Sequence, residues 1–261
     1  MKELKFTIVT PTLNQAHYIE DTIHSVLNQN YSNFEHIIVD GGSTDGTIDI
    51  LKKYKHLRWI SEKDNGQSNA INKGFNLATG DIIAWLNSDD YYENDIFKKI
   101  AEYFSKNDNC KFIYGDITYI DKYKNVLFKV SGDNVNYKNL IRNPDIVRQP
   151  SSFWAREIIE KIGPLNEDLH LAMDYDYILK IAKKFKLYYI SENLSYYRVY
   201  NETKTISLEK KQICELFKVV MKNANIKNPI VYKYFIGRLL NAADDKNFIK
   251  RILTPLRKKI K

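Results

Sequence analysis

The stretch 82-IIAWLNSDDYY-92 decides how the fold of this 261-residue chain is interpreted. Its apolar first half suits a buried strand, and it ends abruptly in an amide, a serine and two adjacent carboxylates, Asp89 and Asp90. In open α/β sheets, ligands bind beyond the carboxyl ends of the strands, where the following loops converge. A strand that runs into acid therefore predicts a binding site at that edge of a sheet.

The segments around this stretch repeat the same organisation. From residue 5 to 120, short apolar runs alternate with stretches of helical spacing, which is the pattern of a parallel α/β sheet with crossover helices. Strands are expected at residues 6–10, 36–39, 57–61, 82–86, 111–114 and 126–130. Helices are expected from His17, Thr47 and Gln67 and over residues 172–185, with Asn14, Ser43 or Thr44, and Ser68 as capping residues.

The composition describes a soluble globular protein, with 44% hydrophobic and 28% charged residues. No apolar run approaches the roughly 20 residues that span a bilayer. The start MKELKFTIVTPT does not fit a signal peptide, so we expect a cytoplasmic protein. Cys110 and Cys214 lie far apart without metal-ligand spacing, which predicts neither a disulfide framework nor a zinc site.

The net charge of +8 is concentrated towards the C-terminus. Residues 201–261 hold 15 Lys and Arg against 5 Asp and Glu, whereas residues 1–200 hold 25 against 27. This confinement argues against a nucleic-acid-binding protein. Apolar and basic positions of residues 247–261 divide between helical faces, which suits either a helix on an anionic membrane surface or an ordinary packed terminal helix. The first interpretation would put the protein peripherally at the inner face of the membrane.

Acidic residues follow three of the expected strands: Asp40, Asp64, and the pair Asp89 and Asp90. Like charges gathered at one edge either stay separate and solvated or hold a cation. Mg²⁺ and Mn²⁺ prefer oxygen ligands, and Mg²⁺ combines one or two carboxylates with water and phosphate oxygens. Two interpretations of the Asp pair stay open on this pattern alone, a metal site or a solvated loop that caps the following helix.

The glycine-rich stretch VDGGSTDGT, residues 39–47, is not one of the common nucleotide-binding motifs. It lacks the Lys-Ser/Thr pair of a P-loop and the G-x-G-x-x-G spacing of a dinucleotide turn. Because the G-x-G-x-x-G spacing is absent, a dinucleotide-dependent oxidoreductase is a weak alternative hypothesis. Gly41 would let the backbone approach a ligand closely, and the alternative is a plain turn with a capping serine.

Several stretches together resemble the family 2 glycosyltransferases. They are TIVTPTLNQAHYIEDTIHSVLNQNY, HIIVDGGSTDGT, EKDNGQSNAINKGFNLATGDIIAWLNSDD, and RQPSSFW followed by AMDYDYILKIA, and they cover about residues 6–200 in the family's order. The resemblance implies a GT-A fold, a Rossmann-like and mostly parallel sheet flanked by helices, in an inverting enzyme that uses a nucleotide-diphosphate sugar. We expect this domain at residues 1–204 and a basic helical C-terminal extension at residues 205–261.

The same resemblance assigns residues to the donor nucleotide and its phosphates. Asp40 matches the carboxylate that accepts a hydrogen bond from the base, and Lys73 would neutralise phosphate unless it is simply solvated. Arg198 lies in a late segment that is close to the diphosphate in the family. The full set expected around the donor is Thr10, Pro11, Asn14, Asp40, Gly41, Asp64, Gly66, Gln67, Lys73, Asn87, Ser88 and Arg198.

The stretch Asn87-Ser88-Asp89-Asp90 occupies the position of the family's D-x-D motif, with an amide in place of the first acid. The resemblance implies that Asp89, with Asp90 beside it, holds Mn²⁺ or Mg²⁺. Such an ion would bridge the diphosphate and neutralise charge on the leaving group. Many relatives have a histidine near the metal where this chain has Tyr200, so a third ligand is left open.

Asp174, in AMDYDYILKIA, matches the family's general base, which takes the proton of the acceptor hydroxyl as it attacks the anomeric carbon. Asp176 points elsewhere on a helix, and we expect it to support Asp174. Without the resemblance, the simpler interpretation is that both acids favour the helix N-terminus through its dipole. The segment at residues 149–152 resembles the acceptor side of the family's site.

These expectations describe a metal-dependent transferase that moves a sugar from a UDP-linked donor to a hydroxyl group of a glycan or lipid-linked acceptor. Its place would be the synthesis of a cell-surface polysaccharide or glycoconjugate. The alternative hypothesis keeps the fold without the catalysis, as a nucleotide-sugar-binding subunit of a glycan-assembly complex.

Overall fold

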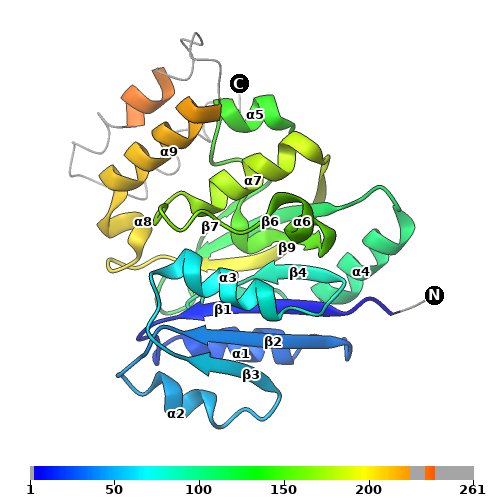
Figure 1. Ribbon diagram of the computed structural model, residues 1–261, viewed down its shortest axis with the longest axis vertical. Helices are drawn as coiled ribbons and strands as arrows, with labels where there is room; N and C mark the ends of the chain where they lie inside the picture. The colour runs from blue at the N-terminus through cyan, green and yellow to red at the C-terminus, as the bar shows by residue number, and fades with distance from the viewer. Residues whose placement is uncertain (1–2, 224–232, 239–261) are drawn as a thin grey trace.

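The computed structural model describes residues 3–223 and 233–238, and within them one mixed sheet lies between two layers of helices (Figure 1). The sheet has nine strands, in the order β3-β2-β1-β4-β8-β6-β9-β5 with β7 paired to β6. The strands are β1 (Phe6–Thr12), β2 (Phe34–Asp40), β3 (Leu57–Ser61), β4 (Ile82–Trp85), β5 (Tyr91–Tyr92), β6 (Phe112–Ile120), β7 (Val126–Val130), β8 (Ser152–Ala155) and β9 (Leu187–Arg198). The helices are α1 (Ile19–Leu27), α2 (Thr47–Leu51), α3 (Gln67–Leu77), α4 (Ile96–Lys106), α5 (Tyr137–Arg142), the 3-10 turn η1 (Gln149–Ser151), α6 (Glu157–Ile162), α7 (Met173–Lys184), α8 (Lys204–Ser207) and α9 (Glu209–Asn223).

The two halves of the sheet differ in strand direction. In the first half, β3, β2, β1 and β4 are all parallel, as the sequence predicts. In the second half, β8 is antiparallel to both β4 and β6, whereas β6 and β9 are parallel to each other. The predicted α/β sheet flanked by helices is confirmed, with an all-parallel first half and a mixed second half.

Alternation along β2 explains the two helical layers. Ile38 packs with Ile19 of α1 and Leu51 of α2. Its neighbour Ile37 packs with Ala70 of α3 on the other face. Successive side chains of a strand point to opposite faces, so an apolar run of this kind needs helices on both sides.

An aromatic cluster joins the two halves of the molecule. The ring centroids of Trp85 on β4 and Trp154 on β8 lie 5.7 Å apart, and Trp154 lies 5.9 Å from Phe75 of α3 and 6.1 Å from Tyr177 of α7. All four side chains are buried. This packing fixes α7 against β4, and it thereby sets the position of the first turn of α7 relative to the turn that follows β4.

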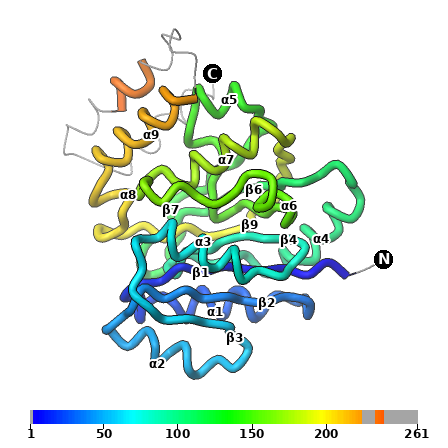
Figure 2. Tube along the Cα trace, in the orientation of Figure 1, coloured from blue at the N-terminus to red at the C-terminus, as the bar shows by residue number. Residues whose placement is uncertain are grey.

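The start of the basic C-terminal segment packs on the rest of the chain. Ile213, Leu216, Val219 and Val220 of α9 belong to the same hydrophobic cluster as α7, and Figure 2 follows the chain from α8 into α9 above the sheet. The predicted boundary between residues 204 and 205 falls inside α8 and stays a prediction. The predicted amphipathic helix at residues 247–261 lies outside the described residues.

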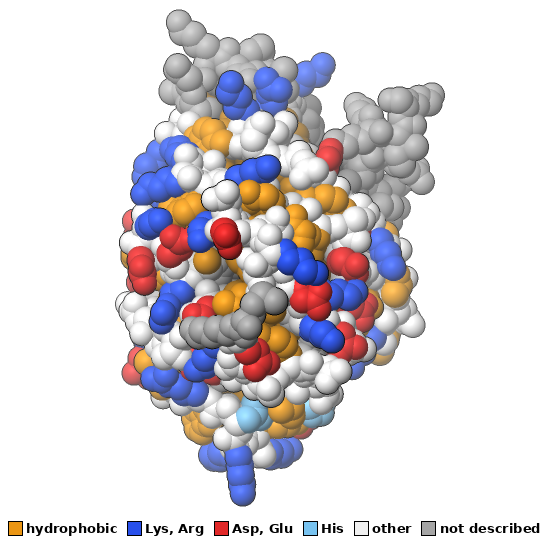
Figure 3. All heavy atoms as spheres, turned by 90° about the vertical axis from the view of Figure 1, so that its right-hand side faces the viewer, with side chains coloured by type: hydrophobic (Ala, Val, Ile, Leu, Met, Phe, Trp, Pro, Cys, Tyr) orange, Lys and Arg blue, Asp and Glu red, His pale blue; other side chains and the backbone are white. Residues whose placement is uncertain are grey.

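Two further observations concern membrane-spanning helices and surface charge. Over residues 3–223 and 233–238, we find no helix with the length and apolarity needed to cross a bilayer. Figure 3 shows basic and acidic side chains interleaved over the face that it presents. Exposed ion pairs such as Lys99–Glu192 (2.7 Å) contribute to this mixture of charges.

The predicted helix caps are wrong. The N-cap positions of α1, α2 and α3 make no side-chain capping hydrogen bond. Asn14 and Ser43 instead join the loop after β1 to the loop after β2, because the Asn14 N–H donates to Ser43 Oγ at 2.7 Å. Asn14 Oδ1 also accepts from the N–H of Thr44 at 2.9 Å. These contacts hold two loops together at the carboxyl edge of the sheet.

Candidate active site

The turn after β4 is held by α1 and β9. Thr22 Oγ1 of α1 donates to the carbonyl oxygen of Asp90 at 2.6 Å. The Asp90 side chain is buried, with Oδ1 accepting from the N–H of Arg198 at 3.0 Å and Oδ2 accepting from Asn87 Nδ2 at 3.3 Å. Asp90 therefore fixes the turn and is not among the residues that line the larger cavity. Of the two predicted metal ligands, Asp89 lines the larger cavity and Asp90 does not, so we expect Asp89 to be the ligand.

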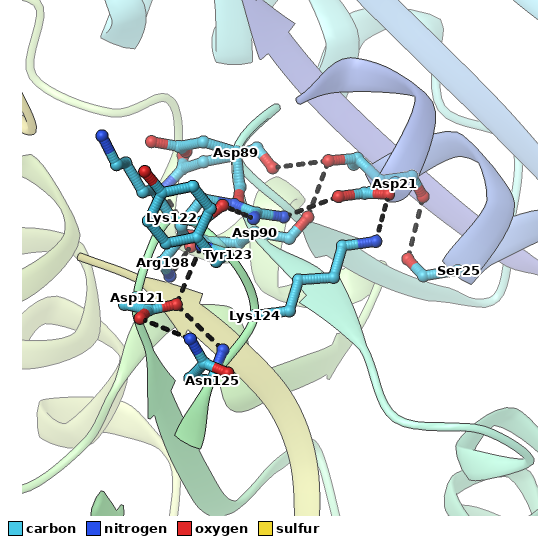
Figure 4. Close-up of polar contacts among 12 residues, drawn as sticks. Asp21, Ser25, Asp89, Asp90, Asp121, Lys122, Tyr123, Lys124, Asn125 and Arg198 are labelled. Carbon is cyan, nitrogen blue, oxygen red and sulfur yellow. Dashed lines mark hydrogen bonds and ion pairs between the residues drawn. The ribbon is translucent and has the colours of Figure 1, made fainter. Parts of the chain in front are cut away.

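Arg198 of β9 holds this turn through hydrogen bonds to Asp89 and Asp90 (Figure 4). Its guanidinium donates from Nε to the carbonyl of Asp89 at 2.9 Å, from Nη1 to the carbonyl of Lys122 at 3.2 Å, and from Nη2 to Asp21 Oδ2 at 2.7 Å. It also lies 4.7 Å over the ring of Tyr18. The side chain is only 1% exposed. In this placement every guanidinium nitrogen bonds within the protein and Arg198 does not line the larger cavity, so the expected contact with the diphosphate stays a prediction.

Asp89 is the acid of the pair that lines the larger cavity. Its Oδ2 accepts from the Tyr200 hydroxyl at 2.9 Å. Desolvation raises the pKa of Asp89, and desolvation together with the charge of Asp89 raises the pKa of Asp90 further. A cation beside the pair would relieve this cost, so the donor set fits a hard divalent ion at Asp89. The described residues hold no cluster of three His, Cys, Asp or Glu side chains suited to a metal.

The larger cavity has a volume of about 400 Å³ and opens beyond the carboxyl ends of β1, β3 and β4. Its walls come from the loops after these strands, from the start of α7 and from residues 200–205. The cavity brings together eight of the predicted site residues: Pro11, Asp64, Gly66, Gln67, Asn87, Ser88, Asp89 and Asp174.

Other predicted donor residues do not face this cavity. Thr10 is fully buried, with Oγ1 bonded to His36 Nε2 at 2.9 Å. Asn14 bridges two loops, as described above. Lys73 lies on α3, and its ammonium pairs with Glu62 at 2.6 Å. The side chain points to this neighbouring carboxylate, which does not line the cavity, so the expectation that Lys73 neutralises phosphate stays a prediction.

Of the two acids expected around the donor, Asp64 lines the larger cavity and Asp40 does not. Asp40 is fully buried and accepts hydrogen bonds from two backbone N–H groups of its own loop at 3.0 Å and from Ser61 Oγ at 2.6 Å. Its carboxylate therefore shapes the loop in this structure and does not face the cavity. Asp64 lines the cavity over Gly41, where a Cβ atom would stand 2.7 Å from Asp64 Oδ2. Gly41 thus leaves the space that the Asp64 carboxylate occupies.

Lys204 is a site residue that the sequence did not reveal. Among the described residues that line the larger cavity, it is the one Lys or Arg. Its Nζ donates to Gln67 Oε1 at 2.9 Å, and Gln67 Nε2 in turn donates to Asn87 Oδ1 at 2.8 Å. Desolvation lowers the pKa of Lys204, while the charges of Asp89 and Asp64 oppose that shift. The Lys204 side chain therefore reaches from α8 to Gln67 at the start of α3, and its charge interacts with that of Asp89.

Asp174 stands in the first turn of α7 and lines both the larger cavity and a second, smaller one. Desolvation raises the pKa of Asp174 to about 6. The N–H of Tyr175 donates to Asp174 Oδ1 at 2.8 Å, and this hydrogen bond acts on the pKa in the opposite direction. A carboxylate with a raised pKa is a stronger base than an ordinary one and is still ionised at neutral pH. Asp176 is buried and pairs with Lys180 at 2.7 Å, so it points away from Asp174 and from both cavities.

The second, smaller cavity adjoins the larger one. The two share the lining residues Gln149, Pro150, Leu171, Asp174, Tyr197, Thr205 and Gln212. Gln149 is held in this boundary because its Nε2 donates to the carbonyl of Trp85 at 2.6 Å. The predicted acceptor-side segment therefore lies on the wall between the cavities, next to Asp174.

The chain is similar to known proteins over most of its length. The profile described as Glycosyl transferase family 2 matches residues 7–163. TuaG of Bacillus subtilis, a glycosyltransferase assigned provisionally to teichuronic acid biosynthesis, is 32% identical over 211 residues, which are 76% of this chain and 80% of TuaG.

Two solved structures share the fold. S. aureus TarS 1–349 in complex with UDP-GlcNAc superposes with a TM-score of 0.66 at 19% identity, over 99% of this chain and 76% of that one. The chain spans 45% of a longer TarS chain. The mannosyltransferase PcManGT of Pyrobaculum calidifontis, in complex with GDP-Man and Mn²⁺, gives 0.65 at 17% identity, over 99% and 80%. The predicted GT-A fold is thereby confirmed, and the chain belongs to glycosyl transferase family 2.

Proposed function

We propose that the protein transfers a sugar from a UDP-linked donor to a hydroxyl group of a glycan or lipid-linked acceptor, with inversion at the anomeric carbon. The observation that carries this proposal is the position of Asp174 on the boundary between two cavities. The larger cavity would hold the donor, since it contains Asp89 and Lys204. Two structural neighbours were solved with nucleotide sugars, UDP-GlcNAc and GDP-Man, which supports this class of donor.

The residues on the boundary supply the chemistry of a direct displacement. The Asp174 carboxylate takes the proton of the acceptor hydroxyl, whose oxygen forms a bond to the anomeric carbon as the bond to the diphosphate oxygen breaks. Asp89 would hold a divalent cation, Mn²⁺ or Mg²⁺, which when bound neutralises charge on the leaving nucleoside diphosphate. Lys204 adds a second positive charge to the lining of the same cavity. Attack from the side opposite the leaving group gives inversion.

Replacing the base tests the proposal. Asp174→Asn keeps the shape of the side chain but cannot accept the proton, so transfer should fall by about 100- to 10,000-fold while UDP-sugar binding is retained. Asp176→Asn is the matched control, because Asp176 lies two residues away and pairs with Lys180. Full transfer activity in Asp174→Asn would exclude the assignment. UDP-sugar binding by the wild-type chain without any transfer or donor hydrolysis would instead identify a non-catalytic binding subunit.

A further inference from the structure

The outer wall of the smaller cavity comes from the C-terminal part of the chain. This cavity, about 240 Å³ in volume, is closed on that side by Thr205, Glu209, Gln212, Leu216 and Arg238. All five lie beyond residue 163, where the match to the family profile ends. The wall next to Asp174 therefore belongs to a part of this chain that the family profile does not describe.

A half-buried ionic cluster holds this wall in place. Asp145 accepts from Arg238 Nη1 at 2.9 Å and from the Tyr234 hydroxyl at 2.8 Å, and it lies 3.4 Å from Arg148 Nη1. Although desolvation opposes ionisation, the charges of Arg238 and Arg148 hold the pKa of Asp145 at about 2. Phe235, between Tyr234 and Arg238 in sequence, is 1% exposed. The segment 233–238 is thus docked on the loop before η1.

The charges of the lining indicate what the cavity accepts. The lining holds four carboxylates and two guanidinium groups, namely those of Asp133, Asp145, Asp174 and Glu209 and those of Arg148 and Arg238. An incoming anion would therefore meet an excess of negative charge. Three tyrosines, Tyr119, Tyr175 and Tyr197, complete the wall. Carboxylates, guanidinium groups and phenols supply acceptors and donors for hydroxyl groups.

Two features suit a single sugar unit. Arg148 lines the cavity, and its Nε is a buried donor with no hydrogen-bond partner among the described residues. The volume of about 240 Å³ is below the range of about 300–1,000 Å³ that is usual for pockets of drug-sized ligands. One monosaccharide ring fits such a space better than an extended chain.

We propose that the smaller cavity binds the terminal sugar of the acceptor as an uncharged, hydroxyl-rich ring, and that the C-terminal residues docked through Asp145 and Arg238 select it. This inference rests on the proposed glycosyltransferase function. It assigns acceptor selectivity to the helices that follow the profile-matched region, whereas donor binding stays with the loops of the parallel half of the sheet.

A matched pair of acceptors tests the chemistry. Transfer from UDP-glucose, UDP-galactose and UDP-N-acetylglucosamine is measured to p-nitrophenyl β-glucoside and to p-nitrophenyl β-glucuronide, which differ in one carboxylate. We expect kcat/KM for the uncharged glucoside to exceed that for the glucuronide at least tenfold. Equal use of the two, or preference for the glucuronide, would overturn the inference and leave the proposed function intact. No Asp174-dependent transfer to any acceptor would remove both.

A second arm tests the C-terminal wall. Arg238→Met should raise the KM for the glucoside about tenfold and leave the KM for the donor and the affinity for UDP unchanged, and Arg238→Lys should restore part of the loss. Tyr234→Phe, which keeps the ring and removes one hydrogen bond, should give a smaller change in the same direction. Lys233→Met is the control, because Lys233 is exposed on the same segment. Equal increases in both KM values would mean that the segment only stabilises the fold.

Discussion

At Asp174, the structure predicts a specific pH dependence of transfer. Desolvation raises its pKa to about 6, and only the ionised carboxylate can take the acceptor proton. Below that pH, kcat/KM for the acceptor should therefore fall about tenfold per pH unit, and above pH 7 it should be flat. Initial rates between pH 5 and 8 measure this, with Asp176→Asn expected to keep the profile. A rate that is constant across the whole range would contradict the assignment of Asp174 as the base.

The two lysines near the donor cavity give a second prediction at this scale. Lys204 lines the cavity, whereas Lys73 pairs with Glu62. Lys204→Met should raise the KM for the UDP-sugar by about 10- to 100-fold, as expected for a lost charge-assisted contact of roughly 1.5–3 kcal/mol. Lys204→Arg should recover part of it. Lys73→Met should change the KM less than twofold, and the reverse order of effects would favour the prediction made from the sequence.

Individual residues also show what the sequence could and could not predict. Asp64, Asp89 and Asp174 line the larger cavity as expected, because their positions follow from strand ends and a helix start. Asp40 and Arg198 were assigned to the donor, but partners distant in sequence, Ser61 and Asp21, turn their side chains into the protein. A motif gives the backbone position of a residue, whereas long-range hydrogen bonds decide where its side chain points.

At the scale of the element, the clamp on the turn after β4 yields a third prediction. Arg198→Met removes the ion pair to Asp21 and the bond to the carbonyl of Asp89. Breaking a buried ion pair by removing one partner costs about 3–5 kcal/mol. Asp21 is 27% exposed, which favours the lower end of that range. Arg198→Lys should restore little of the lost stability, since the single nitrogen of an ammonium cannot replace the three nitrogens of the planar guanidinium, each of which reaches a different acceptor.

Urea unfolding measures this effect, and UDP affinity at low temperature measures its consequence for the site. Asp21→Asn is the partner variant, since it removes the same ion pair from the more exposed side. We expect its destabilisation to be smaller. Wild-type stability in Arg198→Met would show that the clamp does not hold the turn.

The elements of the first half of the sheet could be predicted, because each is an apolar run that ends in a polar loop. The strands β8 and β9 could not. β8 has four residues, and the pairing of β9 with β6 is broken by register shifts near Asp116, so β9 shows no clean alternation. The pattern fails where neighbouring strands, and not the local sequence, set which face is buried.

At the scale of the whole molecule, the two halves of the sheet divide the work of the proposed reaction. The parallel half ends in the loops of the larger cavity, and the mixed half with the C-terminal helices forms the smaller one. The aromatic cluster around Trp85 and Trp154 joins them, and Asp174 lies where they meet. A donor bound at the boundary would therefore touch loops from both halves, so that binding should stabilise the whole fold and not one loop.

This coupling gives the last prediction. A ligand that binds only the folded chain at 100 times its Kd adds about 2.7 kcal/mol of stability, or roughly 5–10 °C in Tm for a chain of this size. UDP with Mn²⁺ should give such a shift, and UDP with EDTA a smaller one that reflects Lys204 and the other protein contacts.

In Asp89→Asn the Tm shifts with UDP–Mn²⁺ and with UDP–EDTA should become equal. Its unliganded Tm should not fall, because the lost carboxylate is one whose charge is disfavoured by desolvation. Asp90→Asn should instead lower the unliganded Tm, because Asp90 accepts hydrogen bonds that fix the turn at both carboxylate oxygens, and an amide has only one oxygen to accept them. A Mn²⁺-dependent shift that survives in Asp89→Asn would move the metal site away from the turn after β4.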